Sequence, residues 1–273
     1  MDKLLKNKNA VIYGGGGAIG GAVARVFARE GARVFIAGRT QAKLDAVVAD
    51  IVAAGGAAEA AQVDAFDQVA VEKHANAIAM KAGGIDIALN AVNVMHDQGT
   101  FLADLSLEEF MRPIDGFLRT LFITSRAVTS HMGGTRPGVI LILSTPGSKS
   151  AAAGVLGHCV TCAGTEAFSR VLAAEMAPKT VRVIGLRPHA IADAPAAGSY
   201  TKDIFKTQAS YKETANGQPV EEWLPGSAMA QSTLLKRLPT LYEVAETAAF
   251  LASDRAGAMT GTIANLSCGA VLD

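Results

Sequence analysis

The stretch Tyr13-Gly14-Gly15-Gly16-Gly17-Ala18-Ile19-Gly20 decides the fold of this chain. It follows a short apolar run at residues 10–13 and precedes an amphipathic segment at 18–30 that predicts a helix. Small residues between a first strand and a first helix let the backbone approach a pyrophosphate, which then lies at the positive end of the helix. The stretch therefore predicts a dinucleotide site, although glycines alone are also typical of a flexible turn.

Beyond this turn, short apolar runs alternate with longer amphipathic segments. The runs predict further strands at residues 33–37, 58–63, 85–92, 139–143, 181–186 and 262–266. The segments predict further helices at residues 41–54, 68–81, 106–132 and 151–177, and a last one from 240. Uniformly apolar strands that alternate with helices are typical of a parallel sheet covered on both faces. We therefore expect an α/β fold: a single Rossmann domain over residues 1–273, with a doubly wound sheet of about seven strands.

Composition and charge exclude several classes of protein. The 273 residues include 25 Lys+Arg and 25 Asp+Glu, and a zero net charge argues against a nucleic-acid or anionic-membrane partner. There is no apolar run of about 18 residues and no signal-peptide pattern, so we expect no membrane-spanning helix. The 3 cysteines make no disulfide framework. These features favour a cytoplasmic protein whose partner is a small-molecule substrate.

One segment, residues 194–239, breaks the alternation of strands and helices. It contains the single tryptophan, Trp223, together with Tyr200, Phe205 and Tyr211. An irregular insert of this length in a compact domain is typical of a lid or a substrate loop. We expect a mobile lid that closes over a partly apolar substrate.

The end of the second predicted strand bears on the choice of cofactor. An NAD site places an acid about 20 residues past the glycines, where it binds the ribose 2′-hydroxyl. This chain has Gly38 and then Arg39 at that place. An arginine can pair with a 2′-phosphate, so we expect NADP(H) to be favoured over NAD(H). The alternative is a solvated arginine, or one that stacks on adenine without a 2′-phosphate.

With these features on one chain, the sequence resembles the short-chain dehydrogenase/reductase family in its single-domain form. The family's T-G-x-x-x-G-x-G turn is similar to residues 13–20, with Ala18 at the middle glycine. Val63-Asp64-Ala65 is similar to the segment whose acid contacts the adenine amine, and Asn90 is kept from the family's N-N-A-G segment. Residues 186–191 resemble the P-G segment beside the nicotinamide, and residues 249–261 resemble the C-terminal signature.

The resemblance implies a set of residues that contact the cofactor. They are Gly14, Gly16, Gly17, Ile19, Gly20, Arg39, Asp64, Ala65, Asn90, Pro188 and Ile191. It also implies a homo-oligomer, with a tetramer expected, in which the two long helices at 106–132 and 151–177 pack as a shared bundle. No metal is expected, because the sequence spacing of His96, His158 and His189 matches no zinc motif.

The family's catalytic residues are largely replaced in this chain. The family uses an Asn, a Ser and a Tyr-x-x-x-Lys motif, and no Tyr-x-x-x-Lys occurs in this sequence. Aligned outward from residues 163–175, the Tyr position falls on His158 and the Lys position on Cys162. The Ser position falls on Thr145, with Ser144 beside it, and the Asn position falls on Phe117.

A histidine can take over the proton transfer of the missing tyrosine. A tyrosine has a free pKa of about 10 and needs a nearby ammonium, whereas an imidazole starts near 6.5 and needs none. We therefore expect His158 to be the proton donor or acceptor, assisted by Ser144 or Thr145, with an ionisation near the ordinary imidazole value. Two alternatives are a Cys162 thiolate paired with His158 on one helix face, and mere packing at both positions.

Three functions fit these residues. The first is an NADP(H)-dependent oxidoreductase of a carbonyl/alcohol pair with an atypical site, in which Tyr200 or Tyr211 of the insert is a further candidate phenol. The second is a cofactor-binding partner subunit or sensor without redox turnover. The third is lyase or isomerase chemistry in the same cleft. The intact glycine turn favours the two functions that keep the cofactor. The lost Asn, Tyr and Lys favour the two functions without redox turnover. We take the oxidoreductase as the working hypothesis.

Overall fold

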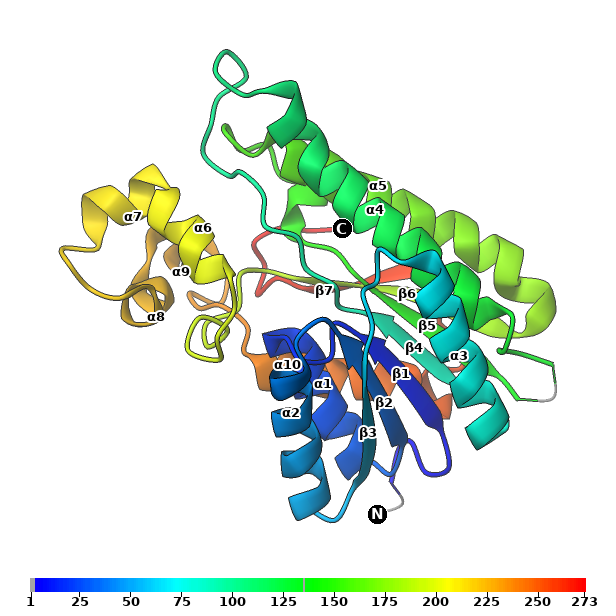
Figure 1. Ribbon diagram of the computed structural model, residues 1–273. Helices are drawn as coiled ribbons and strands as arrows, with labels where there is room; N and C mark the ends of the chain where they lie inside the picture. Colours follow the sequence, from blue (N-terminus) through cyan, green and yellow to red (C-terminus); the bar gives the residue numbers. More distant parts are fainter. Residues whose placement is uncertain (1–2, 135) are drawn as a thin grey trace.

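The glycine turn lies at the carboxyl end of β1, the strand from which the parallel sheet extends in both directions (Figure 1). The computed structural model describes residues 3–134 and 136–273. Its sheet has 7 strands in the order β3-β2-β1-β4-β5-β6-β7, and every neighbouring pair is parallel. The strands are β1 (Asn9–Tyr13), β2 (Arg33–Gly38), β3 (Ala57–Gln62), β4 (Ile87–Asn90), β5 (Gly138–Leu143), β6 (Val181–Pro188) and β7 (Thr262–Leu266). The predicted doubly wound α/β sheet is confirmed.

Helices cover both faces of this sheet, so each strand buries side chains on two sides (Figure 1). On one face lie α1 (Ala18–Arg29), α2 (Gln41–Ala53) and α10 (Leu241–Ala252), and on the other α3 (Gln68–Ala82), α4 (Leu107–Thr129) and α5 (Leu156–Met176). Alternate residues of β1 divide between the two cores: Ala10 and Ile12 face α1, whereas Val11 and Tyr13 face the α3–α5 layer. In the described ranges, no helix is both long and apolar enough to span a bilayer.

Two of the differences from the predicted boundaries shape the site. Helix α5 begins at Leu156 rather than at residue 151, because Gly154 has a φ of 78° that a right-handed helix cannot contain. The carbonyl of Gly154 instead accepts the amide of Gly99, at 2.6 Å. Strand β4 ends at Asn90, whose side-chain oxygen accepts the amide of Val92 and turns the chain out of the sheet. Both segments thereby become cavity walls.

The insert is not the irregular segment that the sequence predicted. It folds into α6 (Thr201–Thr207), α7 (Ala209–Thr214), α8 (Val220–Trp223) and α9 (Ala228–Ser232), which form a separate lobe, drawn in yellow to orange in Figure 1. Phe205, Trp223 and Leu224 are buried in a small core of its own. The helices were missed because each has only 4 to 7 residues, too few to establish a helical period. Single 3₁₀ turns occur at η1 (Pro146–Ser148), η2 (Ala177–Lys179), η3 (Leu224–Gly226) and η4 (Asp254–Ala256).

Alanine substitutions at two glycines with positive φ distinguish the cost of backbone strain from the cost of a steric clash. Gly14 has a φ of 84° and a Cβ there would lie 2.3 Å from the carbonyl oxygen of Ala91, whereas Gly55 has a φ of 78° and open space around it. We expect Gly55→Ala to lower the free energy of unfolding by about 1 kcal/mol, and Gly14→Ala to lose roughly 1–3 kcal/mol more. Urea unfolding followed by circular dichroism measures both, and equal losses would contradict a rigid contact between the glycine turn and the end of β4.

Candidate active site

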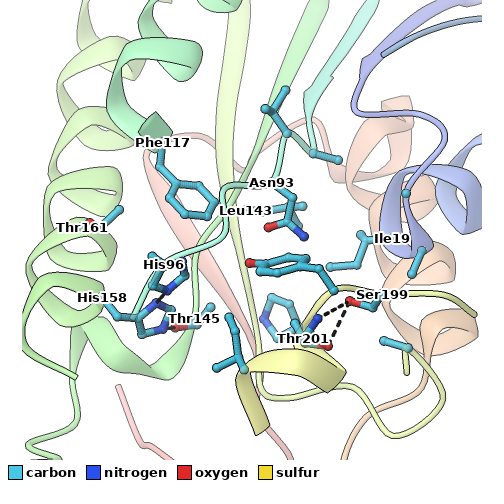
Figure 2. Close-up of a pocket in the computed structure, with 18 of the residues that line it drawn as sticks. Ile19, Asn93, His96, Phe117, Leu143, Thr145, His158, Thr161, Ser199 and Thr201 are labelled. Carbon is cyan, nitrogen blue, oxygen red and sulfur yellow. Dashed lines mark hydrogen bonds between the residues drawn. The ribbon is translucent and has the colours of Figure 1, made fainter. Parts of the chain in front are cut away.

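One cavity of about 1010 Å³ follows the carboxyl ends of the strands, where ligands bind in doubly wound sheets. It joins the glycine turn after β1 to the segment between β5 and α5. The cofactor-contacting residues and the catalytic candidates at and near the family's Ser, Tyr and Lys positions all lie on its wall: Gly14, Gly16, Gly17, Ile19, Gly20, Arg39, Asp64, Ala65, Asn90, Ser144, Thr145, His158, Cys162, Pro188 and Ile191. This placement brings them together, and their individual roles stay predictions. Figure 2 shows the end of the cavity that contains His158 and Thr145.

The glycine turn forms a backbone cradle that fits a dinucleotide. A Cβ on Gly20 would lie 2.3 Å from the carbonyl oxygen of Gly14, so the turn can close this tightly only without side chains. Gly17 is the N-cap of α1, and the first turn of that helix contains no acidic side chain. Its free amides and positive end therefore suit an anionic pyrophosphate. Ala18 replaces the family's middle glycine at the first position of α1 and lines the same cavity.

Two cations stand at the nucleotide end of the cavity. Arg39 follows β2 and Lys43 lies in the first turn of α2, and both side chains are exposed and line the cavity. Opposite them, Asp64 accepts the amide of Phe66 at 3.0 Å and so forms the turn after β3. Lys43 was not predicted from the sequence, although its position four residues after Arg39 in the chain could have indicated it.

At the other end of the cavity, a threonine and a histidine lie within hydrogen-bond distance of each other. Thr145 Oγ1 lies 3.0 Å from His158 Nε2 and accepts the amide of Gly147 at 3.2 Å. Thr145 lies two residues after the end of β5, and His158 lies in the first turn of α5. A strand and a helix therefore position the two side chains. Cys162 is on the same face of α5, and its sulfur lies 3.2 Å from Thr145 Oγ1 and 3.6 Å from His158 Nε2.

Of the two hydroxyls expected to assist His158, Thr145 contacts it and Ser144 points elsewhere. The Ser144 hydroxyl donates to Glu166 at 3.0 Å, and its side chain is buried. Successive residues of extended backbone point to opposite sides, so one strand end cannot present both hydroxyls to the same ring. Of the two predicted hydroxyls, Thr145 and not Ser144 is therefore placed to assist His158.

Behind Ser144 lies a buried ion pair that the sequence analysis missed. Arg187 of β6 donates twice to Glu166 of α5, at 2.7 and 2.9 Å, and the two residues are only 1% and 4% exposed. Ser148 donates to the same carboxylate at 2.5 Å, and the side chain of Asp273 pairs with Arg187 from the other side. Burial raises the pKa of Glu166, but the hydrogen bonds from Arg187, Ser148 and Ser144 outweigh it, so the pKa is lowered.

A second histidine, His96, contacts His158 at this end of the cavity. It lies in the segment after β4, is 5% exposed, and its Nε2 is 3.1 Å from His158 Nδ1, as the dashed line in Figure 2 shows. Phe117, at the family's Asn position, meets the His96 ring edge-on at 5.7 Å between centroids. His189 does not join the pair, because its Nδ1 accepts the amide of Ala190. Within the described residues, no three His, Cys, Asp or Glu side chains could hold a metal ion.

The environment of His158 corrects the expected ionisation. Burial, together with the smaller effect of the neighbouring His96, lowers the pKa of His158 to about 4. The expected value near that of free imidazole is therefore wrong, and at neutral pH the ring is a proton acceptor. Burial also raises the pKa of Cys162 to about 11, so its thiol stays protonated and the thiolate alternative loses support.

Of the two tyrosines considered as a replacement phenol, only Tyr200 lines the cavity. Burial raises the pKa of Tyr200, and the nearby side chain of Asn93 lowers it by less. Tyr211 is directed into the insert, where its hydroxyl donates to the carbonyl of Gln218 at 2.6 Å and its ring packs against Trp223. Tyr211 is therefore a structural residue of the insert.

Comparison with known proteins covers nearly the whole chain. The family described as Enoyl-(Acyl carrier protein) reductase matches residues 16–270. A 3-oxoacyl-[acyl-carrier-protein] reductase of Chlamydia pneumoniae is 28% identical, with 95% of each chain covered. A 3beta-hydroxysteroid dehydrogenase of Mediterraneibacter gnavus is 30% identical, with 94% of this chain and 92% of the relative covered. The crystal structure of a dehydrogenase/reductase from Sinorhizobium meliloti has a TM-score of 0.81 at 22% identity and covers 99% of this chain and 98% of its own.

Removal of one partner of the buried ion pair should destabilise the protein strongly. Arg187→Met leaves the Glu166 carboxylate buried without its cation, and we expect a loss of about 3–5 kcal/mol in the free energy of unfolding. The double variant Arg187→Met/Glu166→Leu removes both charges and should recover most of that loss. Chemical denaturation measures both variants. A single variant as stable as the parent would show that water or another cation reaches Glu166.

Proposed function

Because the chain belongs to the short-chain dehydrogenase/reductase family, whose members are oxidoreductases, we propose that it uses NADP(H) on an alcohol/carbonyl pair and that His158, with Thr145, transfers the proton. The observation that carries this proposal is the single cavity that joins the glycine cradle to the Thr145–His158 pair. When bound, the nicotinamide cofactor supplies the hydride chemistry.

In this proposal His158 is the base that accepts the proton of the substrate alcohol. Its ring is neutral at neutral pH, and Nε2 faces the hydroxyl of Thr145. A substrate alcohol that hydrogen-bonds Thr145 Oγ1 comes within reach of the same nitrogen, which takes the proton from the substrate oxygen. A neutral imidazole is a base and a poor acid, so the site favours oxidation of the alcohol over reduction of the carbonyl at neutral pH.

The lining of the cavity supports an uncharged substrate. Arg39, Lys43 and Asp64 are the charged residues on its wall in the described part of the chain, and all three lie at the nucleotide end. The other end is lined by Phe101, Phe117 and further apolar and neutral polar side chains. The names of the two relatives, an oxoacyl reductase and a hydroxysteroid dehydrogenase, pair a carbonyl with an alcohol and support this reaction class.

Two further proposals concern the insert and the assembly. Gln208 in the insert donates to Gln98 at 3.3 Å across the cavity, which supports a lid that closes there over the substrate. Exposed apolar side chains on α4 and α5, such as Phe122 and Val171, support packing of these helices against those of other copies in a homotetramer.

The competing function is cofactor binding without turnover. Phe117 occupies the position of the family's catalytic Asn and packs against His96, and this apolar replacement favours a lost activity. The pair of His158 and Thr145 favours a retained one. Turnover of an alcohol therefore decides between the two.

A charge reversal at Arg39 tests the cofactor preference. The parent should bind NADP(H) more tightly than NAD(H), and Arg39→Asp should lower NADP(H) affinity by roughly 10- to 100-fold, since hydrogen bonds to charged groups contribute about 1.5–3 kcal/mol. Titration calorimetry with both cofactors measures this. Arg25→Asp, at an exposed arginine outside the cavity, is the matched control and should leave both affinities unchanged. Equal affinities in the parent would refute the preference.

Removal of the His158 imidazole tests the proton transfer. His158→Ala should lower turnover of a secondary alcohol by about 10²–10⁴-fold and leave cofactor affinity nearly unchanged. Alcohol oxidation by the parent should be constant at neutral pH and fall as the pH drops through about 4, where His158 gains its proton. Carbonyl reduction should rise over the same range.

Steady-state kinetics over a range of pH measure the rates of alcohol oxidation and of carbonyl reduction. Full turnover by His158→Ala would make the histidine a packing residue. A parent that binds cofactor but turns over no alcohol and no carbonyl would establish the competing function instead.

A further inference from the structure

We propose that His96 is a positioning residue that holds His158 in the one tautomer whose Nε2 is free to accept a proton. The inference rests on the proposed role of His158 as the base. It assigns a task to a histidine that the sequence analysis considered only as a metal ligand.

The first step is the tautomer of His96, which its own loop fixes. His96 Nδ1 lies 2.7 Å from the carbonyl oxygen of Val94. A carbonyl oxygen only accepts hydrogen bonds, so Nδ1 must carry the proton of the neutral ring. With the proton on the other nitrogen, two lone pairs would meet at this short distance. His96 Nε2 is therefore an acceptor.

A second contact gives the same tautomer independently. The side-chain amide nitrogen of Gln98 lies 3.0 Å from His96 Nε2, and the carbonyl oxygen of that amide accepts a hydrogen bond from Gln208. The Gln98 amide thus presents N–H to the imidazole. Two N–H groups cannot hydrogen-bond each other, so the nitrogen that faces the Gln98 N–H, His96 Nε2, carries no proton.

The tautomer then passes to His158 through a hydrogen bond to the same nitrogen, whose one lone pair the N–H of His158 shares with the N–H of Gln98. His158 Nδ1 lies 3.1 Å from His96 Nε2, and the two ring planes are within 7° of parallel. The centroids are 5.2 Å apart, further than the nitrogens, so the rings meet edge to edge, along the in-plane lone pair. His158 Nδ1 must donate, which leaves its Nε2 unprotonated and directed at the Thr145 hydroxyl.

The surroundings keep both rings neutral. Asp97 and Glu109 lie close enough to His96 to favour its charged form, but burial outweighs them and lowers the pKa of His96. Cys159 and Cys162 of α5 and Tyr200 of the insert line the cavity beside the pair, and burial raises the pKa of each, so none of the three carries a charge at neutral pH. In this setting the hydrogen bonds, rather than a net charge, decide which nitrogen carries the proton.

Nuclear magnetic resonance of the ¹⁵N-labelled protein tests the inference without any substrate. Long-range ¹H–¹⁵N correlations distinguish the two tautomers of each imidazole, and His158→Ala identifies the signals of His158. In the parent, His158 should be protonated at Nδ1 and unprotonated at Nε2. His96→Phe keeps a ring of similar bulk but removes the acceptor, so the signals of His158 should shift toward a mixture of tautomers.

Kinetics with a secondary alcohol supply the second readout. His96→Phe should lower kcat by about 10- to 100-fold, as loss of an orienting partner does, with KM nearly unchanged. His131→Asn, a histidine removed outside the cavity, is the matched control and should change neither readout.

A parent with His158 protonated at Nε2, or a tautomer that is unchanged in His96→Phe, overturns the inference even if a variant folds poorly, because the first measurement needs only the parent. A parent with the expected tautomer that oxidises no alcohol supports the positioning role and refutes the proposed function.

Discussion

The bidentate ion pair between Glu166 and Arg187 lies outside the cavity, yet the position of Thr145 on the cavity wall depends on it. The pair joins α5 to β6, and the hydroxyls of Ser144 and Ser148 donate to the same carboxylate. Thr145 lies between these two serines in the chain, so its backbone is tied down on both sides. Burial of two charges is costly, and it is tolerated here because each charge has several hydrogen-bond partners. The hydrogen bonds to Glu166, on the side of the backbone away from the cavity, thus help to set the direction of the Thr145 hydroxyl.

The sequence allowed the sheet and its covering helices to be predicted because long apolar and amphipathic segments have distinct periods. It misplaced the start of α5, where Gly154 interrupts the helical pattern, and it missed the helices of the insert, which are shorter than any period. The nucleotide end was also accessible, because the glycine turn and Arg39 are local features of the chain.

The arrangement at the His158 end of the cavity could be predicted from the sequence only in part. His158 and Thr145 could be located by resemblance, whereas the contact between His96 and His158 joins residues 62 positions apart. No local pattern reports such a contact. Glu166 and Arg187 were missed for the same reason, although an arginine inside an apolar strand is itself a signal that a buried partner exists. What could not be predicted is therefore the set of contacts made between elements, and those contacts determine which hydroxyl and which nitrogen face the cavity.

The hydrogen bond that joins Gln208 of the insert to Gln98, and through it to His96, ties the position of the insert to the acid–base state of the site. A proton on His96 Nε2 would repel the Gln98 amide and weaken its hold on Gln208. By thermodynamic reciprocity, whatever draws the insert inward makes the two imidazoles harder to protonate. A molecule that closes the insert over itself would in this way keep both imidazoles unprotonated down to a lower pH, and acid would both protonate the imidazoles and release the insert.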